Sequence, residues 1–205
     1  MGIQLKKEGV VFNEVHTSTA LRTQQTASLV LDPLEYKGTV AITPAILEQS
    51  GGGWEGQSRL IYQRNDVKRN LDIDNWNYVP GGDKPGESQH TTAERMTNWS
   101  QQQINNYSKC SGTWNIGVFT HGLAIKLMIA KLFDLYRPLA YKIPTDNTSV
   151  TVLHFVNGVF APSAENTTAL RFQDGKLITS TNDMYDMEMI IPLQRFNDIS
   201  HYSLI

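Results

Sequence analysis

Apolar positions along the first part of the chain predict helices and strands in alternation. Ala20, Ala27 and Leu31 are spaced to form one face of a helix, which the Asp32-Pro33 pair would end. Shorter apolar runs on both sides of this helix have the length of strands. The predicted elements are a helix end at residues 2–8 closed by Gly9, a strand at Val10–Val15, a helix at about 20–31 and a strand at Val40–Ile42. A helix between two strands is typical of a parallel sheet with crossover helices, so we expect an α/β fold.

The most informative stretch covers residues 114–135. Its apolar residues predict a strand at Ile116–Thr120 that is covered on both faces, followed by a buried helix over 123–133. His121 and Gly122 form the turn between them. Backbone N–H groups at the start of a helix favour an anion, and a glycine lets a ligand approach the backbone closely. A histidine-glycine pair on its own is more often a packed turn, so the other candidate residues decide between the two interpretations.

A long polar segment separates these two regions. Residues 49–90 are rich in Gly, Asn, Asp and Gln, a composition and length more typical of a lid or binding loop than of a connector. We expect short helices inside it. Thr91 or Thr92 is then predicted to cap a helix that runs to about Tyr107.

The last quarter of the chain has the pattern of strands and tight turns. A strand is predicted at about Ser149–Phe155, and Asn157-Gly158 and Asp174-Gly175 are good two-residue hairpin turns. We find no internal repeat and no linker. The predicted organisation is a single domain over residues 1–205, with a lid-like loop at about 49–90 and an insertion at about 156–190.

Composition narrows the class of protein. The chain has 205 residues, of which 40% are hydrophobic and 19% charged, as in an ordinary globular domain. Its net charge of -2 argues against a nucleic-acid or membrane-surface partner, because both would require a basic excess. Cys110 is the single cysteine, so no internal disulfide can form, and the first residues lack the apolar core of a signal peptide. We therefore expect a cytoplasmic protein.

Two further residues are candidates for chemistry. Arg22 opens the helix after the first strand, where a guanidinium can present two N–H groups to a phosphate or carboxylate. Glu87 precedes the helix predicted at Thr92, and a carboxyl group there can enter a cleft and act as a general acid. Glu48 and Glu55 flank a glycine run between them. Taken singly, each has a commoner structural explanation: a solvated arginine, a carboxylate at a helix start, or a flexible turn.

Taken in order, these stretches resemble the histidine phosphatase superfamily, the phosphoglycerate mutase-like phosphatases. The resemblance covers the whole chain. Its blocks are LKKEGVVFNEVHTSTALRTQQTA at residues 5–27, ILEQSGGGWEG at 46–56, PGESQHTTAERM at 85–96, FTHGLAIKLMIAKLF at 119–133, and DNTSVTVL at 146–153 with NDISH at 197–201. Blocks in this order and at this spacing form a specific signal.

The resemblance implies a three-layer α/β/α sandwich with a mostly parallel sheet. It also implies a reaction in which a small phosphomonoester gives its phosphoryl group to a histidine and then to water or a second hydroxyl group. Arg22, His121 and Gly122 would bind the phosphate, and Glu87 would protonate the leaving alkoxide, which makes Glu87 and His121 the candidate catalytic residues. The implied partner is a small phosphorylated substrate, and neither a metal nor a cofactor is implied.

One motif of the family is missing from these residues. The family's nucleophile is the histidine of an Arg-His-Gly motif at the end of the first strand, which is internal to the sheet. None of the five histidines here follows an arginine, and only His121 precedes a glycine. Burying about three apolar side chains of such a strand contributes roughly 5–9 kcal/mol, against a domain stability of about 5–15 kcal/mol. We therefore expect an inactive chain that is a truncated form of a longer protein.

Other interpretations stay open. The chain could be a non-catalytic pseudophosphatase, or a module that binds phosphorylated ligands. An unrelated α/β hydrolase is disfavoured because no G-x-S-x-G sequence is present. The sequence leaves open the substrate, the choice between phosphatase and mutase, and the oligomeric state.

Overall fold

The computed structural model describes most of the chain. Side chains are described for residues 1–107, 110, 112–135, 140 and 143–153, and beyond them the backbone of strand segments at 155–156, 159–160, 168–173, 176–180, 190–191 and 193–198.

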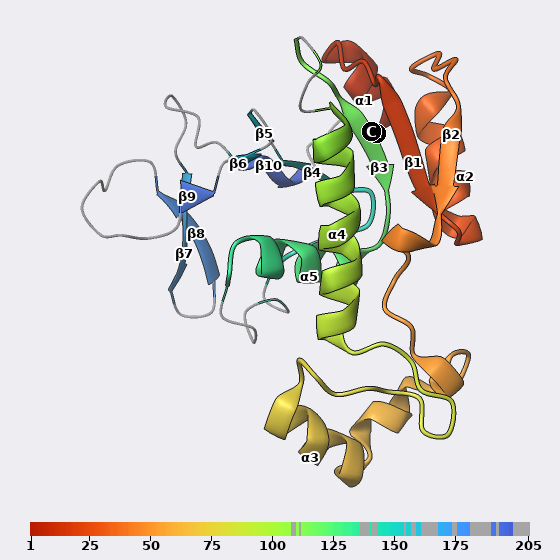
Figure 1. The fold of residues 1–205 in the computed structure, drawn as a ribbon, viewed down its shortest axis with the longest axis vertical. Coiled ribbons are helices and arrows are strands. Elements are labelled where there is room, and N and C mark those ends of the chain that lie inside the picture. The colour runs from red at the N-terminus through yellow and green to blue at the C-terminus, as the bar shows by residue number, and fades with distance from the viewer. Residues whose placement is uncertain are drawn as a thin grey trace.

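A parallel sheet of three strands, at the upper right of Figure 1, organises the first two thirds of the chain. The strands are β1 (Glu14–Ser18), β2 (Val40–Thr43) and β3 (Ile116–Phe119), in the order β2-β1-β3. The parallel arrangement predicted for these three segments is confirmed. Because all three strands run the same way, their carboxyl ends lie along one edge of the sheet.

Helices cover both faces of this sheet. Val15 of β1 packs against Ala27 and Leu31 of α2 (Leu21–Leu31). The next residue, His16, lies edge-on to Trp99 of α4 (Gln89–Tyr107), with 5.2 Å between ring centroids. Successive residues of a strand point to opposite faces, so α2 covers one face and α4 the other, with α5 (Gly122–Leu132) packed beside α4. The result is the predicted three-layer α/β/α arrangement.

The start of β1 differs from the prediction. Helix α1 (Gly2–Lys7) ends where Gly9 adopts a φ of 71° and the Val10 amide donates to the Leu5 carbonyl oxygen at 3.0 Å. Residues 10–13 then lead from this helix to the sheet, and Val11 is 69% exposed. The strand predicted at Val10–Val15 is therefore wrong in its boundaries, because this apolar run connects α1 to β1 instead of pairing within the sheet.

The predicted helices lie close to their expected positions. Helix α2 begins one residue after Ala20, and α5 follows His121 directly. The cap of α4 differs from the prediction, because the side chain of Ser88, and not of Thr91 or Thr92, accepts the Thr91 amide at 3.0 Å. The helix consequently starts earlier, at Gln89.

The predicted lid contains short helices, as expected. It holds two 3-10 turns at Gly52–Trp54 and Arg59–Gln63 and the helix α3 (Asn65–Asp74), which lies apart from the sheet in Figure 1. Trp54 packs against Tyr62 and Tyr78 within the lid, with ring centroids 5.3 and 6.4 Å apart. The lid therefore has a small aromatic cluster of its own.

Two glycine-rich segments hold the base of the lid together, and we call them the clasp (residues 50–53 and 81–87). The Gly53 amide donates to the Lys84 carbonyl oxygen at 2.7 Å, and the Glu87 amide donates to the Ser50 carbonyl oxygen at 2.9 Å. A Cβ on Gly86 would lie 2.2 Å from the Ser50 carbonyl oxygen. Only glycine permits so close an approach of two backbones.

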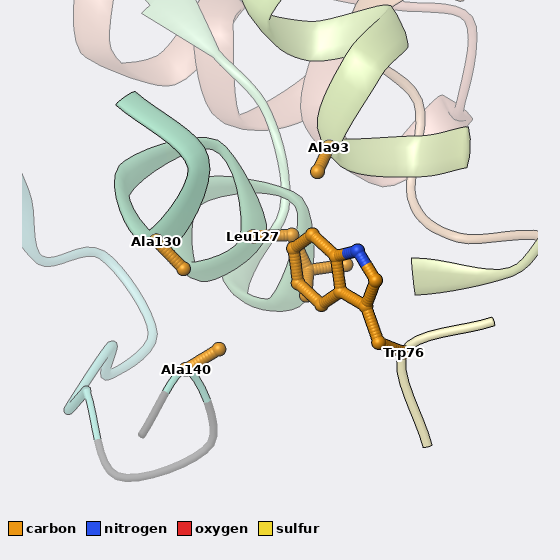
Figure 2. Packing of buried hydrophobic residues seen from close by; sticks show 5 residues of the cluster. All are labelled: Trp76, Ala93, Leu127, Ala130 and Ala140. Carbon is orange, nitrogen blue, oxygen red and sulfur yellow. The ribbon is translucent and has the colours of Figure 1, made fainter. Parts of the chain in front are cut away.

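Trp76 anchors the end of the lid to the helical layer. Its indole points at Leu127 of α5 and packs with Ala93, Ala130 and Ala140 (Figure 2). Trp76 is only 7% exposed, whereas Leu127 and Ala93 are fully buried. The lid is thus fixed to α4 and α5 at one end and by the clasp at its base.

Strand β3 forms one edge of the central sheet. It pairs with β1 on one side, and in the described part of the chain no strand pairs with its other side. Strand β4 (Val150–Leu153) pairs instead with β10 (Leu193–Asp198), antiparallel, in a separate sheet. Gly117 is buried against Phe12, but Val118 is 39% exposed. The prediction that β3 is covered on both faces is therefore wrong, because the face that carries Val118 is partly open at this edge of the sheet.

The predicted hairpins are present as antiparallel pairs. One pair joins β5 (Phe155–Val156) to β6 (Val159–Phe160), and the other joins β7 (Thr168–Gln173) to β8 (Lys176–Ser180). β7 also pairs with β9 (Ile190–Ile191). The turn residues at 157–158 and 174–175, and the end of the NDISH block, lie outside the described residues. That residues 1–205 form a single domain stays a prediction.

Candidate active site

The candidate site lies at the carboxyl ends of β1 and β3. Ser18 ends β1, and Arg22 is in the first turn of α2 just beyond it. His121 follows β3 and occupies the N-cap position of α5. Adjacent parallel strands bring these residues together although about a hundred positions separate them in sequence.

Arg22 and Ser18 contact the two ring nitrogens of His121. The Arg22 guanidinium lies 2.9 Å from His121 Nδ1, and Ser18 Oγ lies 2.8 Å from Nε2. His121 is only 6% exposed and Ser18 is fully buried. Two of the predicted site residues, Arg22 and His121, are therefore in direct contact.

This environment opposes a positive charge on His121. Burial, followed by the positive charges of Arg22 and Arg95, lowers the pKa of His121 from 6.5 to about 4. The imidazole is therefore neutral near pH 7.

Lowering the pH from 7 to 4 is expected to cost the folded chain about 3 kcal/mol through His121 alone. The unfolded imidazole titrates near 6.5, whereas the folded one has a pKa of about 4. As the pH falls through this interval the unfolded state takes up the proton first, so the stability is complete above 6.5 and is lost toward 4. Urea denaturation at pH 7, 6, 5 and 4 measures this dependence. His121→Asn should flatten it and His90→Asn should not; equal slopes in all three chains would contradict the prediction.

Glu48 occupies the start of helix α5. Its carboxylate accepts the amide of Ala124 at 2.9 Å and that of Leu123 at 3.4 Å. The anion predicted at this helix start is thus supplied by the chain itself. Gly122 packs against Thr145, whose Oγ1 would lie 3.0 Å from a Cβ at position 122. The role of Gly122 in binding phosphate stays a prediction.

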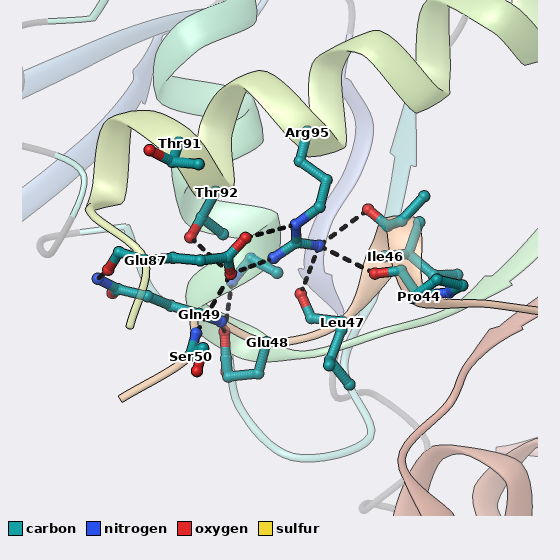
Figure 3. Close-up of polar contacts among 12 residues, drawn as sticks. Pro44, Ile46, Leu47, Glu48, Gln49, Ser50, Glu87, Thr91, Thr92 and Arg95 are labelled. Atoms are coloured by element: carbon teal, nitrogen blue, oxygen red, sulfur yellow. Dashed lines mark hydrogen bonds and ion pairs between the residues drawn. The ribbon is translucent and has the colours of Figure 1, made fainter. Parts of the chain in front are cut away.

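Glu87 is held by an arginine that the sequence did not single out. Arg95 donates through Nε to Glu87 Oε1 at 2.9 Å and through Nη2 to Oε2 at 2.7 Å (Figure 3). Its Nη1 donates to the carbonyl oxygens of Pro44, Ala45 and Leu47, at 3.3, 2.9 and 3.1 Å. Arg95 therefore ties α4 to the segment that leads into the lid.

The same contacts keep Glu87 ionised. Burial raises the pKa of its carboxyl group, but the hydrogen bonds and charge of Arg95, together with the Ser50 amide and the Thr92 hydroxyl, outweigh burial and lower the pKa below 4.5. In this state Glu87 is a carboxylate, and it would have to take up a proton before it could act as a general acid.

Glu87 makes no hydrogen bond to Arg22 or His121 among the described residues. Arg95 links them indirectly, because it binds Glu87 and its charge contributes to the lowered pKa of His121. A groove of about 430 Å³ is found elsewhere, between α2 and β2. The convergence of all three predicted residues on one cleft stays a prediction.

Sequence reasoning missed Arg95 and the role of Ser18. Arg95 lies eight residues after Glu87, in the second turn of α4, whereas Glu87 precedes the first residue of that helix. This short separation could have indicated an ion pair between Arg95 and Glu87. It was passed over because charged residues early in a helix usually face solvent. Ser18 had no local signal, because its partner His121 is distant in sequence.

Two negative findings apply to the described residues alone. None of their helices is long and apolar enough to cross a membrane. No group of three or more His, Cys, Asp or Glu side chains among them is placed to hold a metal ion.

Comparison with known proteins adds to this picture. The family model of the histidine phosphatase superfamily (branch 1) matches residues 4–168. No curated protein matches the chain.

Several solved structures are similar to this chain at low sequence identity. Bacillus stearothermophilus YhfR is 22% identical with a TM-score of 0.63, over 78% of this chain and 76% of that one. Alpha-ribazole phosphatase from Shigella flexneri is 20% identical with a TM-score of 0.60, over 77% and 76%. Mycobacterial glucosyl-3-phosphoglycerate phosphatase in complex with VO3 is 18% identical with a TM-score of 0.60, over 75% of both chains. These similarities show a shared fold.

Proposed function

The chain belongs to the histidine phosphatase superfamily, branch 1, and from that premise we propose that it carries the phosphate-binding pocket of a phosphatase for a small phosphomonoester. The observation that carries the proposal is the contact between Arg22 and His121, 2.9 Å long, at the carboxyl ends of β1 and β3. Two of the similar folds belong to proteins named as phosphatases of alpha-ribazole and of glucosyl-3-phosphoglycerate, which favours a phosphatase over a mutase. The single cysteine supports a cytoplasmic location.

The proposed roles follow from the donors that are present. A guanidinium offers N–H groups in a fork that fits two oxygens of a phosphoryl group, so Arg22 would bind the substrate and stabilise its charge in the transition state. His121 and the Gly122 amide would donate to the same group. In the described state Arg22 donates to His121. When substrate binds, a phosphoryl oxygen must replace His121 as the acceptor of that hydrogen bond.

Glu87 would protonate the leaving alkoxide. Its carboxylate must first gain a proton, and a phosphate dianion nearby would favour that by raising the pKa of the carboxyl group. The bond from phosphorus to the alkoxide oxygen breaks as a bond from phosphorus to a histidine nitrogen forms. Water then attacks the phosphohistidine and releases phosphate.

These 205 residues contain no Arg-His-Gly motif, so they do not include the histidine that would accept the phosphoryl group. The proposal therefore needs this group from a segment outside them. The 205-residue chain by itself is expected to have no phosphatase activity.

The purified 205-residue chain should not turn over p-nitrophenyl phosphate, yet it should bind inorganic phosphate weakly. Loss of a charge-assisted hydrogen bond costs about 1.5–3 kcal/mol, so Arg22→Ala should weaken binding roughly 10- to 100-fold. Arg69→Ala removes an exposed arginine in α3 and serves as the control for lost charge. Isothermal titration and a phosphatase assay measure the two properties. Robust turnover that His121→Ala abolishes would show that His121 is itself the nucleophile, against the role proposed here.

A second candidate function is a non-catalytic module that binds phosphorylated ligands. It is favoured by the same combination of an intact Arg22–His121 pair and no nucleophile motif in these residues. The two candidates differ in their response to an added Arg-His-Gly strand, which should give turnover only if the chain belongs to a phosphatase.

A further inference from the structure

A chain of hydroxyl groups continues from His121 into the start of α2. Ser18 Oγ lies 2.8 Å from His121 Nε2 and 2.8 Å from Thr23 Oγ1, and it accepts the Ala20 amide at 3.3 Å. Thr23 Oγ1 in turn donates to the Ala20 carbonyl oxygen at 2.7 Å. Ser18 is fully buried and Thr23 is 6% exposed, so bulk water does not compete for these bonds.

One assignment of donors and acceptors satisfies all of these contacts at once. A carbonyl oxygen only accepts, so the single Thr23 hydroxyl proton goes to Ala20, and Thr23 Oγ1 accepts the proton of Ser18. Ser18 then has no proton left for His121, so Nε2 must carry the hydrogen. A guanidinium only donates, so Nδ1 must be the acceptor of Arg22.

We propose that Ser18 and Thr23 are positioning residues that hold His121 as the tautomer protonated at Nε2, which leaves Nδ1 as a hydrogen-bond acceptor. Arg22 enforces the same tautomer while it donates to Nδ1. The two hydroxyl groups matter most when Arg22 turns away, because they alone then keep the hydrogen on Nε2.

This arrangement assigns a function to Nδ1. When Arg22 turns to an oxyanion, Nδ1 loses its donor and gains a proton, so His121 becomes a cation that donates to the anion. This consequence rests on the proposed function, whereas the tautomer does not. The charged groups around His121 are Arg22 on α2, Arg95 on α4, paired with Glu87, and Glu48 at the start of α5.

The test uses nitrogen-15 NMR of the histidine rings, because protonated and unprotonated ring nitrogens resonate at different positions. Arg22→Ala removes the redundant constraint from the 205-residue chain, and His121 should remain protonated at Nε2. Adding Thr23→Val removes the acceptor for the Ser18 hydroxyl, whose proton then has His121 Nε2 as its acceptor. The tautomer should shift to a mixture containing the Nδ1–H form.

Thr23→Ser is the matched control in the same Arg22→Ala background, because it keeps the hydroxyl group and should keep the Nε2–H form. Unchanged amide spectra show that each variant is folded. A mixed tautomer in Arg22→Ala alone, or no change with Thr23→Val, would overturn the proposal.

Sulfate provides the second measurement, because its charge is constant over the pH range used. When sulfate binds to the wild-type chain near pH 6, Nδ1 of His121 should take up a proton, so that both ring nitrogens are protonated. Failure of sulfate to bind, with the tautomer results as expected, would count against the proposed phosphate site and leave the positioning role standing. Sulfate bound with His121 still neutral would overturn the role given to Nδ1.

Discussion

Fusing an apolar strand that ends in Arg-His-Gly to the amino end of the chain should raise its melting temperature by well over about 5 °C. β3 has hydrogen-bonded pairing on one side only within the described residues, and Val118 beside that free edge is 39% exposed. A strand added there would pair its backbone with β3 and place its own side chains beside Val118. Burying about three of its own apolar side chains would add roughly 5–9 kcal/mol, which is comparable to the net stability of a domain.

The same fusion should create phosphatase activity. The carboxyl end of the added strand would lie beside the carboxyl end of β3, next to His121, since parallel neighbours end along one edge. Its histidine would then face a phosphoryl group held by Arg22. A covalent nucleophile typically accounts for about three or more orders of magnitude in rate, so turnover should rise from background to a readily measured value.

A matched strand ending in Arg-Asn-Gly separates the two effects. It should give the same increase in melting temperature with no turnover of p-nitrophenyl phosphate. Greater stability without activity in the Arg-His-Gly fusion would favour the non-catalytic module. No gain of either kind would mean that the free edge of β3 does not receive a strand.

Replacing Arg95 by leucine should destabilise the chain by about 3–5 kcal/mol, the cost of leaving one member of a desolvated pair without its partner. The substitution removes two hydrogen bonds to Glu87 and three to the carbonyl oxygens of residues 44–47. Both side chains of the pair are less than one quarter exposed, at 22% and 24%, so water restores little of the loss.

Two comparisons sharpen the Arg95 prediction. Lys131→Leu breaks the more exposed Lys131–Glu94 pair and should cost less than about 1 kcal/mol. Glu87→Leu added to Arg95→Leu should recover part of the loss, because it removes the unpaired carboxylate. Urea denaturation of the four chains measures these differences. An Arg95 effect as small as that of Lys131 would show that the pair does not organise the base of the lid.

The pattern of apolar residues along the chain predicted the helices that depend on nearby residues. The spacing of Ala27 and Leu31 identified α2, and the apolar run after Gly122 identified α5. The strand predicted at Val10–Val15 began too early, because the apolar residues of Val10–Phe12, which lead out of a helix, have the same composition as a strand. Their exposure depends on where Gly9 turns the backbone, which no periodicity records.

Candidate-site residues were predictable where a block of sequence marked them, as for Arg22 and His121. Their partners were harder to find. Glu48 caps a helix that begins about 75 positions later, and Arg95 binds carbonyl oxygens about 50 positions earlier. Contacts of this kind depend on how the elements pack, so they follow from the fold and not from spacing along the chain.

The clasp at the base of the lid and the stretch beyond it should differ in the substitutions that they tolerate. Its glycines fix the backbone that presents Glu87, because the Gly86 and Ser50 backbones leave no room for a Cβ. Most side chains between residues 57 and 75 are exposed, and only Val67 of α3 is buried. Substitutions in that stretch should therefore leave the Glu87 carboxylate in place, so the outer part of the lid can change its surface chemistry independently of the clasp.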